Sequence, residues 1–519
     1  MSFNRSIFKI STINVFNSIF VLANSVVIAQ LFGTSRNIEL FFAARIVVNM
    51  AINLSLAGTF AEIILPIYHR SKAENGLEGA QRMISSFTNI YLVIISILAM
   101  IMIIAAPIII KVLTPGFTAE NHILGVSMIR VLSPLLVFMF FNGQIKVLLN
   151  AEQKYGRPEI ISTINLIIRP AIIFVGFSTF DIWILIISLW IVTVMESVML
   201  LFLYKTSGNR YYFKVNYEWV EISPHLKLVW STFPNILISQ STNIIINSQI
   251  SMLPAGVFAI FNYAEMIVKR IQSIFSKPIL TVFFSKYSLG HSLNESDIKT
   301  LIRSSLSKYL LIYFPSLVLV IVCGKYGLSF LWYSEHFSID SIQIALSIII
   351  IQLFAYIIIS VTGIARKLLV INGFVRKTYW LLSLSAIINS MLYWFLIGKY
   401  GFHGYLFGVM GSALFQSVII FSALKYFKKK LLFFYSMRDI AKWVIIFIVS
   451  IPTLNTLVNF LFGTDEFAID RYILFIRGSI SAILSILLVL VLGYMFNLGS
   501  VKSLMKKTYT VIGKLHHHG

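Results

Sequence analysis

Residues 85–112, SSFTNIYLVIISILAMIMIIAAPIIIKV, decide the fold class of this chain. The run carries no charge before Lys111, and a helix needs about 20 apolar residues to cross the ~30 Å hydrocarbon core of a bilayer. Lys111 lies near the end of the run, where a long side chain reaches the polar interface. We therefore interpret this stretch as one membrane-spanning helix.

Similar apolar runs recur along the whole chain. Gly, Pro, Asn and charge clusters separate them, and they predict spans at 10–31, 38–66, 85–112, 124–148, 159–178, 182–204, 229–251, 256–284, 307–330, 341–363, 378–398, 403–424, 440–462 and 472–495. Of the 519 residues, 58% are hydrophobic and 12% are charged, against ~45–50% and ~25% in an average soluble domain. The predicted fold class is all-α, a polytopic membrane protein of about 14 transmembrane helices.

Lys and Arg are shared unequally between the two sets of alternating loops. One set, together with both termini, holds 30 of the 42 Lys and Arg residues, whereas the other set holds only Arg36, Lys325, Lys399 and Arg471. The positive-inside rule then predicts that both termini are cytoplasmic. We attribute the net charge of +22 to the membrane topology and to attraction between the basic loops and anionic membrane lipids. We therefore expect no nucleic-acid partner.

Two halves of the chain repeat at a fixed offset. The stretches LNAEQKYGR (149–157) and LVINGFVRK (369–377) lie 220 residues apart, and so do FAAR (42–45) and NYAE (262–265). The offset predicts two six-helix pseudo-repeat lobes followed by two C-terminal helices. The predicted boundaries are 1–222 and 223–430 for the lobes, 431–500 for the appended helices and 501–519 for a cytoplasmic tail. Parallel repeats typically place the substrate site at the interface between the lobes.

The eighth predicted span carries a basic stripe with one acidic partner. Glu265 and Lys269 are four residues apart and share a face on which they can pair. Arg270 and Lys277 are seven residues apart on an adjacent face, and Glu265 is the repeat equivalent of Arg45. A charge inside a membrane persists only where it is paired or faces water. The stripe indicates either a cationic cavity that binds a pyrophosphate or an interlobe salt-bridge network that closes a gate.

The sequence has no signature of catalysis. It contains no Walker A glycine loop and, apart from the terminal tail, no His pair at metal-ligand spacing. Cys323 is the single cysteine, so an internal disulfide and a Cys-based metal site are excluded. We expect a transporter, not an enzyme, without a cofactor or metal. Arg169, directly before Pro170, is open to a structural or a functional interpretation.

Two segments resemble a known family. FFAARIVVN (41–49) and AGTFAEIILPIY (57–68) are similar to the MurJ (MviN) lipid-linked-sugar flippases, as are Ala106-Pro107, Thr114–Phe117 and Leu149-Asn150. The resemblance implies fourteen helices, membership of the multidrug, oligosaccharidyl-lipid and polysaccharide exporter superfamily, and a place in the bacterial cell (inner) membrane.

The departures from the family pattern bear on the substrate. Family members that flip the peptidoglycan precursor carry arginines at positions that correspond here to Ser18, Asn24, Ile52 with Asn53, and Met266. An acidic position survives as Glu39 and a basic one as Arg130. The retained scaffold without these charges favours a different lipid-linked saccharide.

These observations lead to one favoured function and two alternatives. We expect a flippase that moves an undecaprenyl-pyrophosphate-linked oligosaccharide across the cytoplasmic membrane by alternating access for cell-surface polysaccharide synthesis. The alternatives are a lipid II flippase and a cation-coupled multidrug antiporter of the same superfamily. The expected partners are the lipid-linked saccharide, membrane lipids, and a polysaccharide polymerase and glycosyltransferases.

The predicted site residues fall into two groups. The substrate-binding group is Arg45, Arg130, Lys269, Arg270 and Lys277. The group predicted to act in gating or ion coupling is Glu39, Glu265, Asn49 and Asn53. The sequence leaves the energy source open between an ion gradient, the membrane potential and downstream use of the substrate.

Overall fold

A computed structural model describes residues 3–54, 57–152, 156–213, 233–289, 295–371, 374–426, 437–462, 471–496, 498 and 501–502. The predicted lobe boundaries at 222–223 and 430–431 lie outside these residues, as does the predicted tail beyond Lys502.

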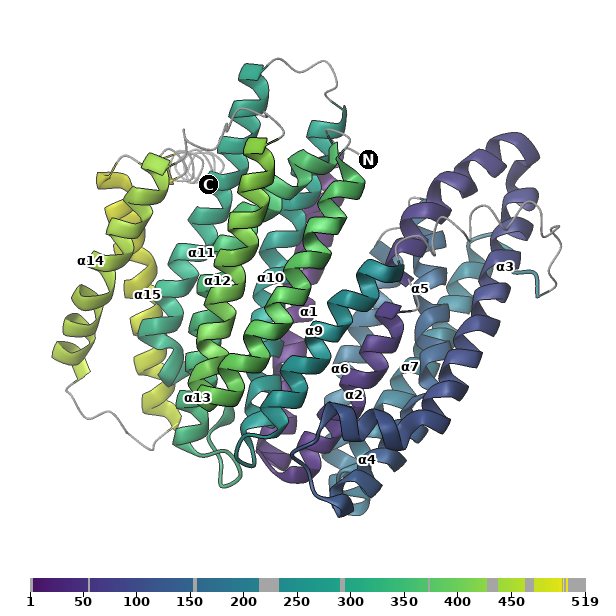
Figure 1. Cartoon of the computed structure of the whole chain (residues 1–519), viewed down its shortest axis with the longest axis horizontal. Coiled ribbons are helices and arrows are strands. Elements are labelled where there is room, and N and C mark those ends of the chain that lie inside the picture. Colours follow the sequence, from purple (N-terminus) through teal and green to yellow (C-terminus); the bar gives the residue numbers. More distant parts are fainter. Residues whose placement is uncertain are drawn as a thin grey trace, which may run out of the picture. The chain divides into compact units, whose positions relative to one another are not determined.

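The described part of the chain is helical throughout and forms no strand, as the sequence predicts (Figure 1). The helices are α1 (Phe3–Phe32), α2 (Arg36–Leu54), α3 (Ala57–Leu113), α4 (Ala119–Leu132), α5 (Leu135–Ala151), α6 (Gly156–Phe180), α7 (Trp183–Thr206), α9 (Phe233–Ser251), α10 (Val257–Leu289), α11 (Glu295–Trp332), α12 (Ile339–Ile371), α13 (Val375–Tyr426), α14 (Met437–Phe462) and α15 (Arg471–Met495).

Two glycines interrupt the longest helices. Gly76 in α3 has φ 70° and Gly401 in α13 has φ 56°, a left-handed conformation that glycine adopts without a steric penalty. The predicted spans 378–398 and 403–424 are therefore the two arms of α13. Within the described residues, ten helical stretches are long and apolar enough to cross a membrane. The polytopic all-helical fold is confirmed, and the number of fourteen spans stays a prediction.

The chain forms two compact units. The first, unit 1, contains residues 1–262 and 386–402. Within it, α6 packs against α1 and α7, α5 packs against α3 and α7, and α2 packs against α4. One arm of α13 joins this unit beside α9, because the Thr242 hydroxyl lies 3.1 Å from the carbonyl oxygen of Ala386 and 2.9 Å from the Ser390 hydroxyl.

The second unit, unit 2, contains residues 263–385 and 403–519. Here α11 packs against α12, α14 and α15, and α14 also packs against α15 (Figure 1, green to yellow). The rings of Phe314 and Trp443 stack with their centroids 5.7 Å apart. Trp443 is 1% exposed, so the first of the two appended helices is part of a packed core. The predicted lobes of the repeat and their boundaries stay a prediction.

The predicted orientation is testable by cysteine labelling in intact cells. In a Cys323→Ser background, Ala119→Cys is expected to react with a membrane-impermeant maleimide, because the turn before α4 is predicted to be external. Ala73→Cys, also at an exposed position, is expected to react only after the cells are permeabilised. Labelling of Ala73→Cys in sealed cells would contradict the orientation.

Candidate functional site

One polar face runs along α2. Arg45, Asn49 and Asn53 are spaced four residues apart, so they lie one above another on the helix. Arg45 is half-buried, with its guanidinium carbon 5.2 Å from the ring centroid of Phe42 and 5.9 Å from that of Phe41. Asn49 and Asn53 are exposed. Guanidinium and amide groups on one face supply hydrogen-bond donors that suit a phosphate.

A second cation lies inside unit 1, on α6. Arg169 is 9% exposed, and its Nε donates a hydrogen bond to the Ser188 hydroxyl of α7 at 3.3 Å. Arg45 of α2 is near enough to act on it electrostatically. Arg169 stays open to a structural or a functional interpretation.

Glu39 has a different environment from the one expected of a mobile gate. Its side chain is fully buried, and its Oε1 accepts backbone N–H groups of Gly256, Phe258 and Ala259 at 2.8, 3.1 and 3.4 Å. Its Oε2 accepts a hydrogen bond from Arg36 at 2.6 Å. A carboxylate at a helix N-terminus satisfies the free N–H groups and opposes the helix dipole. Glu39 thus fastens the first turn of α10 to α2.

Arg130 lies on the exposed surface of α4. Its Nε donates to the backbone carbonyl of Ile103 at 3.3 Å, which connects α4 with α3. Arg130, a predicted substrate contact, therefore lies where α4 meets α3.

The stripe on α10 contains the ion pair that its spacing predicts. Lys269 Nζ lies 2.6 Å from Glu265 Oε2, and the two side chains are 62% and 30% exposed. Arg270, the next residue, is half-buried. Lys277 also lies in α10, but its side chain is outside the described ones. Of the three cations of the stripe, Arg270 is the one whose side chain is described and partly buried.

Sequence reasoning missed a charged cluster between α5, α6 and α7. Lys146 Nζ lies 2.6 Å from Glu196 Oε1 and donates to the Ser162 hydroxyl at 2.8 Å. Lys146 lies within α5, near the end of the predicted span 124–148, although it was counted with the Lys and Arg residues of the cytoplasmic loops. The available signal was Glu196, the single acidic residue of the otherwise apolar α7. An ionisable residue in such a span is functional or paired.

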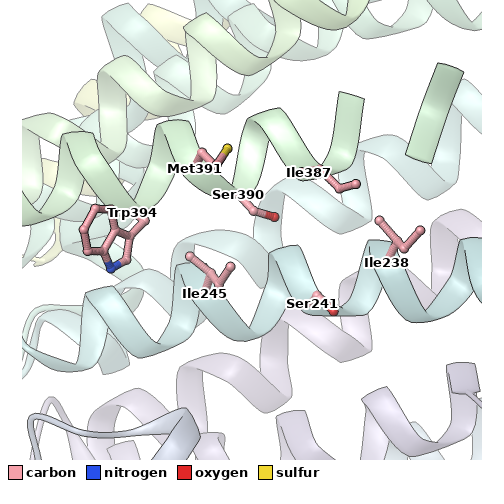
Figure 2. Close-up of a pocket in the computed structure, with 7 residues that line it drawn as sticks. All are labelled: Ile238, Ser241, Ile245, Ile387, Ser390, Met391 and Trp394. Atoms are coloured by element: carbon pink, nitrogen blue, oxygen red, sulfur yellow. The ribbon is translucent and has the colours of Figure 1, made fainter. Parts of the chain in front are cut away.

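An apolar groove of about 360 Å³ lies between α9 and α13 in unit 1 (Figure 2). Its lining is Ile238, Ser241, Ile245, Ile387, Ser390, Met391 and Trp394. Two serine hydroxyls are its only side-chain polar groups apart from the Trp394 indole N–H, so the groove suits a hydrocarbon chain and not a phosphate. Among the described residues, no group of three or more His, Cys, Asp or Glu side chains is placed to hold a metal ion.

Comparison with protein families identifies the scaffold. The family model described as "Lipid II flippase MurJ" matches residues 28–471. The chain belongs to the MurJ family. The resemblance seen in the sequence is therefore confirmed.

Individual relatives of this MurJ-family chain are distant. It is 24% identical over 333 residues to "Probable lipid II flippase MurJ" of Buchnera aphidicola subsp. Baizongia pistaciae, which covers 63% of the chain and 64% of that protein. It is 22% identical over 160 residues to "Lipid II flippase MurJ" of Burkholderia cenocepacia, covering 30% and 31%. The chain thus spans less than two thirds of the length of the curated relatives it matches.

Solved structures show the same fold. The MurJ-family chain matches "Lipid II flippase MurJ, inward closed conformation" with a TM-score of 0.76 at 19% identity, covering 94% of this chain and 98% of that one. It also matches an inward-facing multidrug resistance MATE family transporter of the MOP superfamily, with a TM-score of 0.64 at 14% identity over 80% and 96% of the two chains. The architecture is that of MOP superfamily transporters.

Proposed function

We propose that this chain is a flippase that carries a polyprenyl-pyrophosphate-linked saccharide of the lipid II type across the bacterial cytoplasmic membrane. The observation that carries the proposal is the MurJ family match over residues 28–471. The curated relatives cited above are named as lipid II flippases. This reverses the order of the sequence-based interpretations, in which lipid II was the alternative.

The proposed head-group contacts are cationic. Arg45 on α2 and Arg270 on α10, each taken by itself, carry donors that suit a diphosphate. An arginine binds two phosphate oxygens at once because its planar guanidinium presents paired N–H groups. We propose that these residues bind the pyrophosphate, with Arg130, Lys269 and Lys277 as further cations. Glu265 is proposed to act in gating through its pair with Lys269, and Asn49 and Asn53 are proposed to act in gating or ion coupling.

A second candidate substrate, another lipid-linked oligosaccharide, is favoured by one observation. The positions that correspond to the family's arginines hold Ser18 and Asn24, both buried, and Met266, which is half-buried. An uncharged set at these positions weakens the case for an identical head group. For this candidate, a polysaccharide polymerase and glycosyltransferases are proposed partners. A multidrug antiporter is the least supported function, because a basic cavity repels cationic drugs.

Complementation separates the two candidate substrates. In a bacterium depleted of its peptidoglycan-precursor flippase, the chain expressed at native level is expected to restore growth. A variant with both Arg45→Ala and Arg270→Ala is the matched control and is expected to fail at equal protein level, because two proposed phosphate contacts are lost. Failure of the parent chain to restore growth, together with export of another saccharide, would replace lipid II as the substrate.

A further inference from the structure

Helices α6 and α7 meet along a polar seam. The Ser162 hydroxyl donates to Glu196 Oε1 at 3.1 Å, and Arg169 Nε donates to the Ser188 hydroxyl at 3.3 Å. The two contacts are seven residues apart on α6 and eight residues apart, in the opposite direction, on α7. The helices are therefore antiparallel, and the contacts stand two turns, or about 10 Å, apart along the seam.

One end of the seam holds the Lys146–Glu196 ion pair. The two side chains are 27% and 16% exposed, and Asn142 Nδ2 lies 3.5 Å from the carboxylate. Glu196 is ten residues before Thr206, where α7 ends, so it lies about 15 Å from the predicted cytoplasmic end of the helix. The pair therefore lies near the middle of the predicted span.

Beyond the ion pair, the seam contains buried polar atoms without hydrogen-bond partners. Within the described residues these include Asn142 Oδ1, Asn165 Oδ1 and Arg169 Nη2, on side chains that are 3%, 7% and 9% exposed. Asn142 Nδ2 donates to the carbonyl of Thr193, and the α6–α7 register places Thr193 opposite Asn165. The unpartnered atoms therefore follow the seam from Asn142, which contacts the ion pair, past Asn165 to the buried arginine itself.

Helix α1 adds another such atom. The Thr163 hydroxyl donates to Asn17, and Phe32 meets Phe177 with ring centroids 5.0 Å apart. These two contacts make α1 and α6 parallel and place Asn24 at the level of the buried arginine. Asn24 is 4% exposed, and its Oδ1 has no partner among the described residues. We call the whole set the polar column: Glu196, Ser162, Asn142, Asn165, Asn24, Arg169 and Ser188.

The polar column needs a small molecule that both donates and accepts hydrogen bonds. Three unpartnered oxygens require donors and one unpartnered N–H requires an acceptor, and a buried polar atom left unsatisfied costs about 1–3 kcal/mol. Water fills both roles and bridges buried polar groups in this way. A hydrated column inside a membrane with a carboxylate at one end has the chemistry of a proton relay.

We propose that the polar column is a proton-coupling site and that Glu196 is the carboxylate that takes up the proton. A proton from the aqueous phase binds the Glu196 carboxylate, while Lys146 keeps its own proton. The net charge of the pair rises from zero to +1 and returns to zero when the proton leaves on the other side. This inference rests on the proposed flippase function and gives that function an energy source.

The groups around Glu196 set the conditions for proton uptake. Lys146 of α5 is the charge that contacts it, and α6 contributes the uncharged Ser162. Of the charged residues of α4, Glu120 lies in its first turn and Arg130 in its last, where Arg130 bonds to a backbone carbonyl of α3. Arg169 of α6 lies two turns away. A positive charge close to a carboxylate favours the ionised form of that carboxylate. A proton shifts the balance between two conformations only if it binds them unequally, so the pair must open in the other conformation.

A pH gradient across proteoliposomes tests the proposal with the full chain and fluorescent lipid II as the probe. The measured quantity is the flipping rate with a gradient of one pH unit divided by the rate without it. One pH unit supplies 1.36 kcal/mol, which is a factor of ten in an equilibrium constant, and the ratio for the parent is expected to lie between about 2 and about 10. Glu196→Gln is expected to lower the ratio to one. Glu74→Gln, an exposed carboxylate paired with Arg70 in the same unit, is the matched control and keeps the parent ratio.

A double variant guards against misfolding. Glu196→Gln alone leaves Lys146 as an unpaired charge in the membrane, whereas Lys146→Gln with Glu196→Gln leaves a neutral pair. The double variant is also expected to flip lipid with a ratio of one. A parent ratio of one, or a parent-like ratio in either variant, would overturn the proton-coupling site. If the parent moves no lipid with or without a gradient, the proposed flippase function fails instead.

Discussion

Replacing Glu39 by alanine is expected to destabilise the detergent-solubilised protein by on the order of 3 kcal/mol. The buried carboxylate accepts hydrogen bonds from three backbone N–H groups and from Arg36. The substitution removes all of them at once and leaves the N–H groups at the start of α10 without an acceptor. The measurement is the midpoint of thermal unfolding, followed by intrinsic fluorescence at fixed detergent concentration.

Two further variants separate anchoring from gating. Glu39→Gln keeps one carbonyl oxygen for the backbone N–H groups, so we expect it to lose less stability than Glu39→Ala. Glu74→Ala, which removes an exposed carboxylate, is expected to leave the midpoint unchanged. If Glu39→Gln unfolds like the parent but no longer supports flipping, Glu39 acts in gating, as first expected. A parent-like midpoint for Glu39→Ala would contradict the anchoring role.

The sequence predicts the fold class because the bilayer imposes a length and a composition on each span. The apolar side chains of a run such as 85–112 find a favourable environment only in the lipid core of the bilayer. Local spacing also predicts local contacts, as the Glu265–Lys269 pair shows. Helix periodicity alone brings residues four apart together, so no tertiary information is required. Within these limits, the α10 stripe is the part of the candidate site that the sequence predicts best.

Contacts between distant segments could not be predicted in the same way. The N–H groups bound by Glu39 lie more than 200 residues away, at 256–259. The Lys146–Glu196 pair joins α5 and α7. In both cases the partner depends on tertiary packing, which a single sequence does not specify.

The substrate shows another limit of sequence reasoning. The absence of arginine at Ser18 and Asn24 favoured a substrate other than lipid II, whereas the family match and the named relatives favour lipid II. Charge at single positions is a weak guide because a diphosphate is satisfied by any convergent set of cations.

Arg270→Ala is expected to reduce flipping sharply while the protein level stays normal. Arg270 is half-buried on α10 and follows the Glu265–Lys269 pair. Loss of a charge-assisted hydrogen bond costs about 1.5–3 kcal/mol, which corresponds to about 10- to 150-fold in binding. Arg270→Lys is expected to restore only part of the rate, because an ammonium group cannot bind two phosphate oxygens in the bidentate manner of a guanidinium. The assay is flipping of fluorescent lipid II in proteoliposomes over a range of lipid concentrations.

The control for Arg270 is Arg303→Ala, which removes an exposed arginine of α11 in the same unit. It tests whether the loss of any positive charge slows flipping, since a general effect of charge on the membrane surface would lower both rates alike. We expect the Arg303 variant to flip lipid at the parent rate. The lipid concentration that gives half the maximal rate is expected to rise for Arg270→Ala, since a lost phosphate contact weakens binding. If Arg270→Ala flips lipid at the parent rate with normal protein level, the α10 stripe is structural, and the pyrophosphate must bind other cations.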